Sequence, residues 1–157
     1  MASKQTIIDV FNRLMVRFPG YMEKNKESIP STMGMWTVAF KYTPDNVLLR
    51  ATQLIIESDR AYFPNIAEID ERARRVVLID NQKIATYEGR LDTYNKYKDA
   101  TPDEIDAWVD MQRFIYQDRG WTTKDFKEMV ETFKDQLNKA IRDLPETYRK
   151  DRNISEV

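Results

Sequence analysis

The sequence predicts an all-α protein, and three observations support this. Glycine is rare, with four among 157 residues, which argues against turn-rich β structure. Apolar residues recur at spacings of three and four, as they do along one face of a helix. The run Val76 to Ile79 would also fit a strand, but no partner strand is visible, so we assign it to a helix.

The composition is that of a folded chain with a highly charged surface. Hydrophobic residues make up 41% and charged residues 32%, a balance typical of soluble domains. The net charge of −1 gives no general attraction to nucleic acid. No apolar run reaches the roughly 18 residues of a membrane span, and no signal peptide is recognisable. We therefore expect a cytoplasmic protein with no membrane partner, in line with the absence of cysteine.

Histidine and cysteine are both absent, which excludes several kinds of site. The usual zinc sites and the Ser-His-Asp or Cys-His nucleophile systems need one or both of these residues. An enzyme would have to rely on carboxylates, tyrosine or lysine. No glycine-rich phosphate loop followed by Lys-Ser or Lys-Thr is present, so ATP hydrolysis is not expected. The sequence predicts no catalytic residue, no metal and no cofactor.

The first two helices are expected on either side of a polar loop. The first begins at Ser3 or Thr6 and ends at Pro19-Gly20, and residues 21–30 form the loop. The second begins at Ser31 or Thr32. Its Trp36 is expected to be a core anchor, because Phe40 lies one turn away on the same face. The apolar stripe of the first helix comprises Ile7, Val10, Phe11, Leu14, Met15 and Phe18.

The third helix and the junction after it have distinct start signals. Thr43 is expected to cap the third helix, with Pro44 at its first position. Pro64 disfavours the α region for Phe63, so the third helix must end before it. Asn65 and Glu68 have the spacing of a capping box, which starts the next helix. Tyr62 and Phe63 are then expected to turn inward and close a small core.

The pattern changes near Asn81, where a narrow apolar seam begins, formed by Ile84, Tyr87, Leu91 and Tyr94. Residues 97–100 break it, and Thr101 with Pro102 and Glu104 starts another helix. That helix has Trp108 and Val109 on its apolar stripe. Gly120 fits the position just past its C-terminus. A last long helix begins at Thr122 or Thr123 and ends at Pro145.

These elements predict two helical parts and a tail. Residues 1–80 would form a small four-helix domain, and residues 81–145 a C-terminal helical region, either a hairpin or an extension. Residues 146–157 are mostly charged and are expected to be frayed or disordered.

The order of motifs in residues 5–75 resembles one protein family. The first helix ends in Arg-Phe-Pro at 17–19, and Trp36 lies on the second. Tyr-Thr-Pro-Asp-Asn-Val at 42–47 opens the third helix, and Tyr-Phe-Pro-Asn-Ile-Ala-Glu-Ile at 62–69 follows it. This order is similar to that of phage-encoded loaders and inhibitors of the replicative DNA helicase. There the junction often reads Phe-Pro-Pro-Ser/Thr-Ile-Ala-Glu-Ile, and here Asn65 makes it one residue shorter.

The resemblance implies a function by binding. Such loaders are small helical proteins that hold a hexameric, ATP-driven helicase inactive and deliver it to an origin-bound replication initiator. The C-terminal part of the family is flexible and is thought to engage the helicase. This chain departs from that pattern, because residues 82–144 have strong helical periodicity. The implied partners are the helicase hexamer and a replication initiator.

Two groups of charged residues are candidates for partner binding. Arg72, Arg74 and Arg75 form the densest basic cluster, which either pairs with nearby acids on a solvated face or contacts a partner. Asp103, Asp106 and Asp110 lie in an acidic stretch without lysine or arginine from residue 99 to 112. That stretch could meet a basic surface, and its paired carboxylates could hold a metal, the reading we favour least.

Two further features leave alternatives open. Trp121, in the turn before the last helix, either staples that helix or protrudes as a binding anchor. Lys96 and Lys98 lie beside Tyr94 and Tyr97, a combination that can stack on and contact single-stranded nucleic acid. A helical DNA-binding protein using residues 72–75 and 96–98 is therefore the alternative to the helicase-binding factor.

Overall fold

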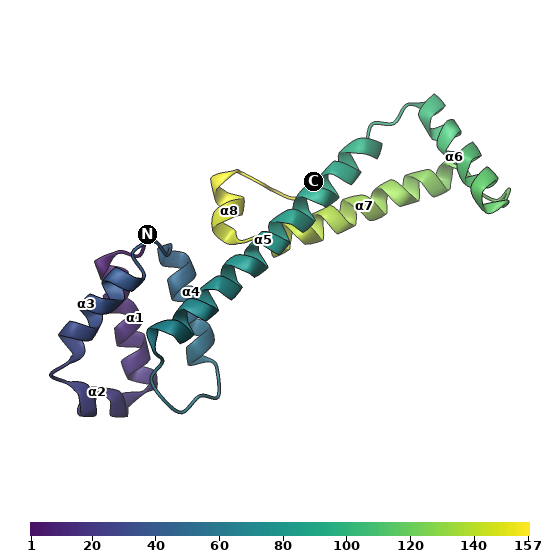
Figure 1. The fold of residues 1–157 in the computed structure, drawn as a ribbon. Coiled ribbons are helices and arrows are strands. Elements are labelled where there is room, and N and C mark those ends of the chain that lie inside the picture. Colours follow the sequence, from purple (N-terminus) through teal and green to yellow (C-terminus); the bar gives the residue numbers. More distant parts are fainter. The chain divides into compact units, whose positions relative to one another are not determined.

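The computed structural model describes all 157 residues as eight α-helices without a strand, which confirms the all-α prediction (Figure 1). The helices are α1 (Lys4–Arg17), α2 (Pro19–Asn25), α3 (Ile29–Ala39), α4 (Asp45–Ile56), α5 (Ile66–Tyr97), α6 (Pro102–Tyr116), α7 (Thr123–Asp143) and α8 (Glu146–Asp151). The chain divides into two compact units, Met1–Ile79 and Asp80–Val157, and α5 runs through the boundary. None of the helices has the length and apolar character needed to cross a membrane.

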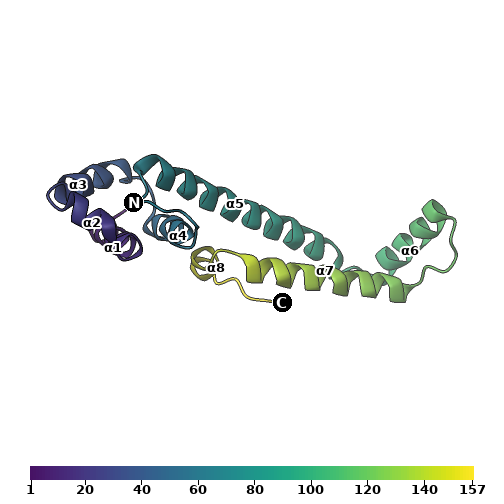
Figure 2. The ribbon, with the colours of Figure 1, turned by 90° about the horizontal axis from the view of Figure 1, so that it is seen from below.

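The N-terminal unit is built around an apolar core to which α1 contributes one complete face. Ser3 caps α1 by accepting a hydrogen bond from the Thr6 N–H at 3.1 Å. Of the two possible starts, Ser3 and Thr6, the helix therefore uses Ser3. In Figures 1 and 2, α1 to α4 lie together around the first turns of α5. The core residues are Ile7, Val10, Phe11, Leu14, Phe18, Trp36, Phe40, Leu48, Ile55 and Ile69. The expectation that Trp36 anchors the core is confirmed, since its side chain is 3% exposed.

The predicted loop at residues 21–30 is wrong. Helix α2 occupies Pro19–Asn25, and α3 already begins at Ile29 rather than at Ser31 or Thr32. Each helix has a proline in its first turn, where the missing N–H costs nothing and the fixed φ suits a helix. The polar residues of this stretch belong to the exposed side of a short helix, which composition alone cannot distinguish from a loop.

The predicted cap at Thr43 is also wrong. Helix α4 begins at Asp45 with Pro44 as its N-cap, and no side chain caps it. The Asp45 carboxylate instead accepts a hydrogen bond from the Ser3 N–H at 2.7 Å, which ties the start of α4 to the start of α1. That hydrogen bond lowers the pKa of Asp45 below its ordinary value.

The capping box at the start of α5 is confirmed. The Asn65 N–H donates to Glu68 Oε2 and the Glu68 N–H donates to Asn65 Oδ1, both at 2.9 Å. Arg60 adds an ion pair, with its Nη2 2.6 Å from Glu68 Oε2. The bond from Arg60 and the bond from the Asn65 N–H lower the pKa of Glu68.

Of the two junction residues that were expected to turn inward, Phe63 does so and Tyr62 does not. Phe63 turns inward and contacts the rings of Phe11, Phe18, Tyr21 and Trp36. Tyr62 is 73% exposed, so the expectation that it closes the core is wrong. Tyr62 lies in a bend of the junction and Phe63 follows it, so the two neighbouring side chains do not share one environment.

Helix α5 continues without interruption across the expected break near Asn81. Val76 to Ile79 are helical, as predicted, because residues 80–83 contain neither proline nor glycine to end the helix. The change of pattern reflects a change of neighbours. Ala73 and Val76 pack with Val47 and Ala51, whereas the later residues of α5 belong to a different cluster.

The C-terminal unit has a narrow apolar seam. It contains Tyr87, Leu137, Ala140, Ile141 and Leu144, with Ile84, Leu91, Tyr94, Tyr148 and Ile154 packed against it. Burial in this seam raises the pKa of Tyr87. As predicted, Thr101 caps α6. Of the two starts that the sequence allowed for α7, Thr122 is the N-cap, and it forms a capping box with Asp125.

Two predictions for the C-terminal unit are corrected. Helix α6 ends at Tyr116, and the residue just past its end is Gln117, in the left-handed region with φ 50°, and not Gly120. Residues 146–157, expected to be frayed or disordered, contain α8, and the Asn138 side chain forms two hydrogen bonds with the Val157 backbone. Tyr148 and Ile154 supply the apolar contacts that hold this segment, a contribution too small to stand out in a charged sequence.

The inward position of Phe63 predicts a measurable loss of stability on truncation. We expect Phe63→Ala to lower the free energy of unfolding by about 2–3 kcal/mol, less than the roughly 3–5 kcal/mol for a fully buried ring such as Phe11. Urea denaturation followed by circular dichroism measures both. A loss below about 1 kcal/mol for Phe63→Ala would mean that the ring contributes little to the core.

The capping box predicts a pH-dependent contribution from Glu68. Because folding lowers the pKa of Glu68, its contribution is complete above the ordinary carboxyl pKa and disappears as the pH falls through the lowered value. We therefore expect Glu68→Gln to be less stable than the parent chain at pH 7, with the gap closing on acidification. Denaturation at several pH values measures this gap. A constant gap would contradict the Arg60–Glu68 interaction as its cause.

Candidate partner-binding surfaces

Helix α6 exposes a row of large apolar side chains in the C-terminal unit. Met111, Phe114 and Ile115 are 59%, 84% and 56% exposed. Their spacing of three and four places them on one face of the helix, away from Val109, the buried residue of α6. We call these three residues the Phe114 surface. Contiguous exposed apolar residues of this size mark interaction sites more often than the scattered ones of an ordinary surface.

The predicted acidic residues border this surface. Asp103, Asp106 and Asp110 are all exposed and follow one another at spacings of three and four, and Asp110 lies one turn before Phe114. No ion pair joins these three carboxylates to a cation. The one basic residue of α6, Arg113, donates its Nε–H to the Trp121 carbonyl at 2.8 Å. We call Asp103, Asp106 and Asp110 the acidic row. The structure thus places an apolar surface next to carboxylates that form no ion pair. It contains no cluster of three or more side chains arranged to hold a metal ion.

Trp121 packs beside α6 and is partly exposed. Its ring meets Trp108 edge-on at 5.6 Å and lies roughly parallel to Tyr116 at 6.0 Å. Trp108 in turn contacts Phe126 of α7 at 5.3 Å. These contacts place Trp121 as a link between the turn and α6, closer to the stapling role than to that of a protruding anchor.

The predicted basic residues are largely occupied. Arg74 pairs with Asp70 at 3.0 Å and Arg75 with Glu71 at 2.7 Å, each one helical turn away. Arg72 is partly exposed. The ammonium groups of Lys96 and Lys98 lie 5.2 and 5.9 Å from the ring centroids of Tyr97 and Tyr94, respectively. These rings are therefore already covered in part by cations of the same helix end.

The N-terminal unit contains a hollow that the sequence did not indicate. It has a volume of about 830 Å³ and lies where the end of α1, α2, α3 and the junction meet. Phe63, Pro64 and Asn65 line it together with Tyr21 and Trp36. Pairing of the junction with α2 was not foreseeable, because α2 itself was expected to be a loop. A smaller hollow of about 280 Å³ brings Thr43 and Pro44 next to Arg74.

A scan against protein-family models and searches of curated proteins and solved structures gave no match to this chain. Its function is therefore inferred from these surfaces and from the order of motifs in the N-terminal half. Of the predicted partner-binding residues, the structure brings together Asp103, Asp106 and Asp110, while Arg74 and Arg75 are paired with neighbouring acids.

The geometry of α6 predicts that two similar substitutions change the free energy of unfolding by different amounts. Phe114→Ser should change the free energy of unfolding by less than about 0.5 kcal/mol, because the side chain is exposed and the two residues have similar helix propensity. Val109→Ser should cost about 2 kcal/mol, since it removes a buried apolar contact and buries a hydroxyl. Chemical denaturation of the two variants measures this difference. Equal losses would contradict the orientation of α6.

Proposed function

We propose that this protein is an ATP-independent binding factor that loads or restrains a hexameric replicative DNA helicase in phage DNA replication. The Phe114 surface is the observation that carries the proposal. Met111, Phe114 and Ile115 form an apolar row that the chain itself leaves uncovered. A partner that covered it would remove this apolar area from water, which stabilises a complex by about 25 cal/mol per Å² before the costs of association.

The acidic row makes the surface selective. Unpaired carboxylates beside an apolar row favour partners with basic residues in matching positions and disfavour acidic ones. Asp103, Asp106 and Asp110 can form such pairs without first breaking an ion pair within the chain. This arrangement is suited to recognising a protein, and it involves no bond chemistry.

The resemblance of the N-terminal half gives the partner its proposed identity. The motif residues Trp36 and Phe63 pack together in the N-terminal core, with 5.8 Å between ring centroids. The resemblance implies that the C-terminal part engages the helicase, and the Phe114 surface belongs to the C-terminal unit. The N-terminal unit would then be available for another partner, for which the resemblance suggests a replication initiator.

Direct DNA binding through residues 72–75 and 96–98 is the less supported alternative. Arg74 and Arg75 already pair with acids, and a phosphate contact would have to replace those pairs. Binding of this kind would fall steeply with salt, because each phosphate contact releases counterions. A shift of DNA at low salt without helicase binding would favour this alternative.

The proposal predicts a complex that depends on the Phe114 surface. The protein should co-elute with the cognate helicase hexamer in gel filtration at micromolar concentration without added ATP. The double variant Met111→Ser/Phe114→Ser should weaken binding by about tenfold or more, as expected for central apolar anchors of an interface. Val16→Ser is the matched control, since Val16 of α1 is also 84% exposed and lies in the other unit.

Two outcomes would contradict the proposal. Separate elution of the two proteins would reject helicase binding altogether. Co-elution that the double variant leaves unchanged would assign the contact to another surface. Val16→Ser should bind as the parent chain does, so a loss in this control would point to a general effect of removing exposed apolar groups.

A further inference from the structure

The hollow of the N-terminal unit is lined by the aromatic residues Phe18, Tyr21, Trp36, Tyr62 and Phe63. We call it the Phe63 pocket. The Tyr21 ring stacks on Phe63 with 3.7 Å between centroids and 11° between planes, and Trp36 lies 5.8 Å from the same ring. All lining residues belong to one compact unit, so the pocket is complete within it. Its volume of about 830 Å³ is within the usual range for a ligand site.

Two large exposed side chains border the Phe63 pocket. Met35 of α3 is 62% exposed, and Tyr62 of the junction is 73% exposed, and both line the hollow. Methionine is flexible and polarizable, and it adapts to differently shaped apolar partners. Tyrosine provides a rigid apolar surface with a polar end. Both side chains are therefore available to contact an apolar group that enters the pocket.

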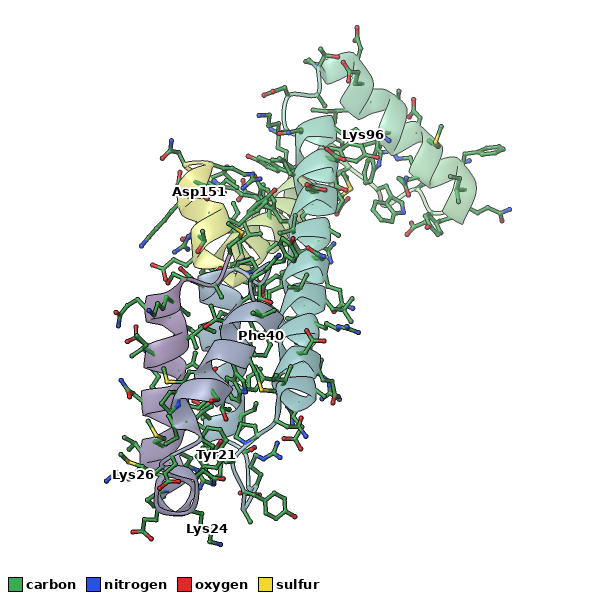
Figure 3. All side chains as sticks on the ribbon, turned by 60° about the vertical axis from the view of Figure 1, so that its left-hand side comes forward. Tyr21, Lys24, Lys26, Phe40, Lys96 and Asp151 are labelled. Atoms are coloured by element: carbon green, nitrogen blue, oxygen red, sulfur yellow. The ribbon has the colours of Figure 1, made fainter.

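The charged residues that line the pocket are all cations. Arg17 and Lys24 line it, whereas no aspartate or glutamate does. The Arg17 guanidinium is already occupied, since it donates to the carbonyls of Ile56, Ser58 and Arg60 at 3.1–3.3 Å. Lys24 is exposed and forms no ion pair, and Figure 3 shows it on the same helix as Tyr21, beyond the core. Lys24 is therefore the cation available to a ligand.

Trp36 supplies a second donor. Its indole N–H forms no hydrogen bond within the chain, although 97% of the residue is covered. No fully buried side-chain nitrogen or oxygen lacks a partner, so the Trp36 N–H is not completely covered by the chain. A tryptophan N–H in a largely apolar setting usually finds an acceptor. The free polar groups of Lys24 and Trp36 are thus both donors, and a carboxylate is the ligand group that satisfies them.

We infer that the Phe63 pocket binds a short acidic segment of a partner protein. An apolar side chain of the segment lies against Phe63 between Met35 and Tyr62, and a neighbouring carboxylate meets Lys24. The pocket belongs to the N-terminal unit and the Phe114 surface to the C-terminal unit, so the two sites bind different segments. This second site does not depend on the helicase proposal.

A titration of the full chain with three tripeptides tests the inference. The probe is acetyl-Asp-Phe-Asp-amide. Acetyl-Asn-Phe-Asn-amide lacks the charge, and acetyl-Asp-Ala-Asp-amide lacks the apolar anchor. The readout is the indole N–H resonance of Trp36, assigned by its persistence in Trp108→Phe and Trp121→Phe. We expect the probe to shift this resonance saturably, with each control peptide binding about fivefold more weakly or worse.

Two lysines of the same segment provide matched variants. Lys24→Glu should weaken binding of the probe peptide by about fivefold or more, because the substitution replaces an attractive charge by a repulsive one. Lys26→Glu is the control, since Lys26 is also exposed but does not line the pocket. Figure 3 labels both lysines. The Lys26→Glu variant should bind the probe within about twofold of the parent chain. Helicase binding should be unchanged in both variants, which separates this test from that of the proposed function.

Three results would overturn the inference. Absence of a shift with the probe would mean that the pocket takes no such segment. Equal binding of the charged and uncharged peptides, or equal losses in Lys24→Glu and Lys26→Glu, would remove the role of the carboxylate. A Trp36 shift that follows protein concentration without peptide, and disappears in Phe114→Ser, would identify a second copy of the chain as the occupant.

Discussion

The N-terminal unit depends on the position of one ring, that of Phe63. Its centroid lies 5.6 Å from that of Phe11, 5.8 Å from that of Trp36 and 3.7 Å from that of Tyr21, so one residue of the junction contacts α1, α2 and α3. Pro64 follows directly and restricts the backbone of Phe63. The packing of this ring therefore fixes both the three helices and the start of α5. A pocket formed by such mutually supporting contacts is largely preorganised, which lowers the entropic cost of binding.

The C-terminal unit is stabilised differently, and this difference leaves α6 free for binding. Its seam lies between α5 and α7, whereas α6 buries Val109 and otherwise relies on the partly exposed contact of Trp108 with Trp121 and Phe126. A helix with few buried contacts has a low free energy of local unfolding. Binding at the Phe114 surface would add the contacts that α6 lacks, so complex formation and helix stability would reinforce one another.

Features of the fold set by neighbouring residues could be predicted from the sequence, and features set by distant contacts could not. The capping box at Asn65 needs only residues three positions apart, and it forms as predicted. Thr43 also has the right neighbours for a cap, but the hydrogen bond between Asp45 and Ser3, distant in sequence, accompanies a helix start one residue later than predicted. Val76 to Ile79 were predicted to be helical rather than a strand because the rest of the chain offers no partner strand, and this prediction is confirmed.

The candidate sites were harder to predict because α6 has apolar residues on two faces. The sequence pattern groups Ile115 with Ile105, Trp108 and Val109, whereas in the structure Ile115 is exposed with Met111 and Phe114. Periodicity alone cannot decide which stripe the chain covers, since either would suit a core. The contact of α6 with α7 selects the Val109 side and leaves Phe114 exposed. The acidic row could be recognised in advance, but its significance depends on this choice, because carboxylates beside a covered stripe would only be a solvated helix face. The same residues beside an uncovered stripe define a surface with both apolar and charged requirements for its partner.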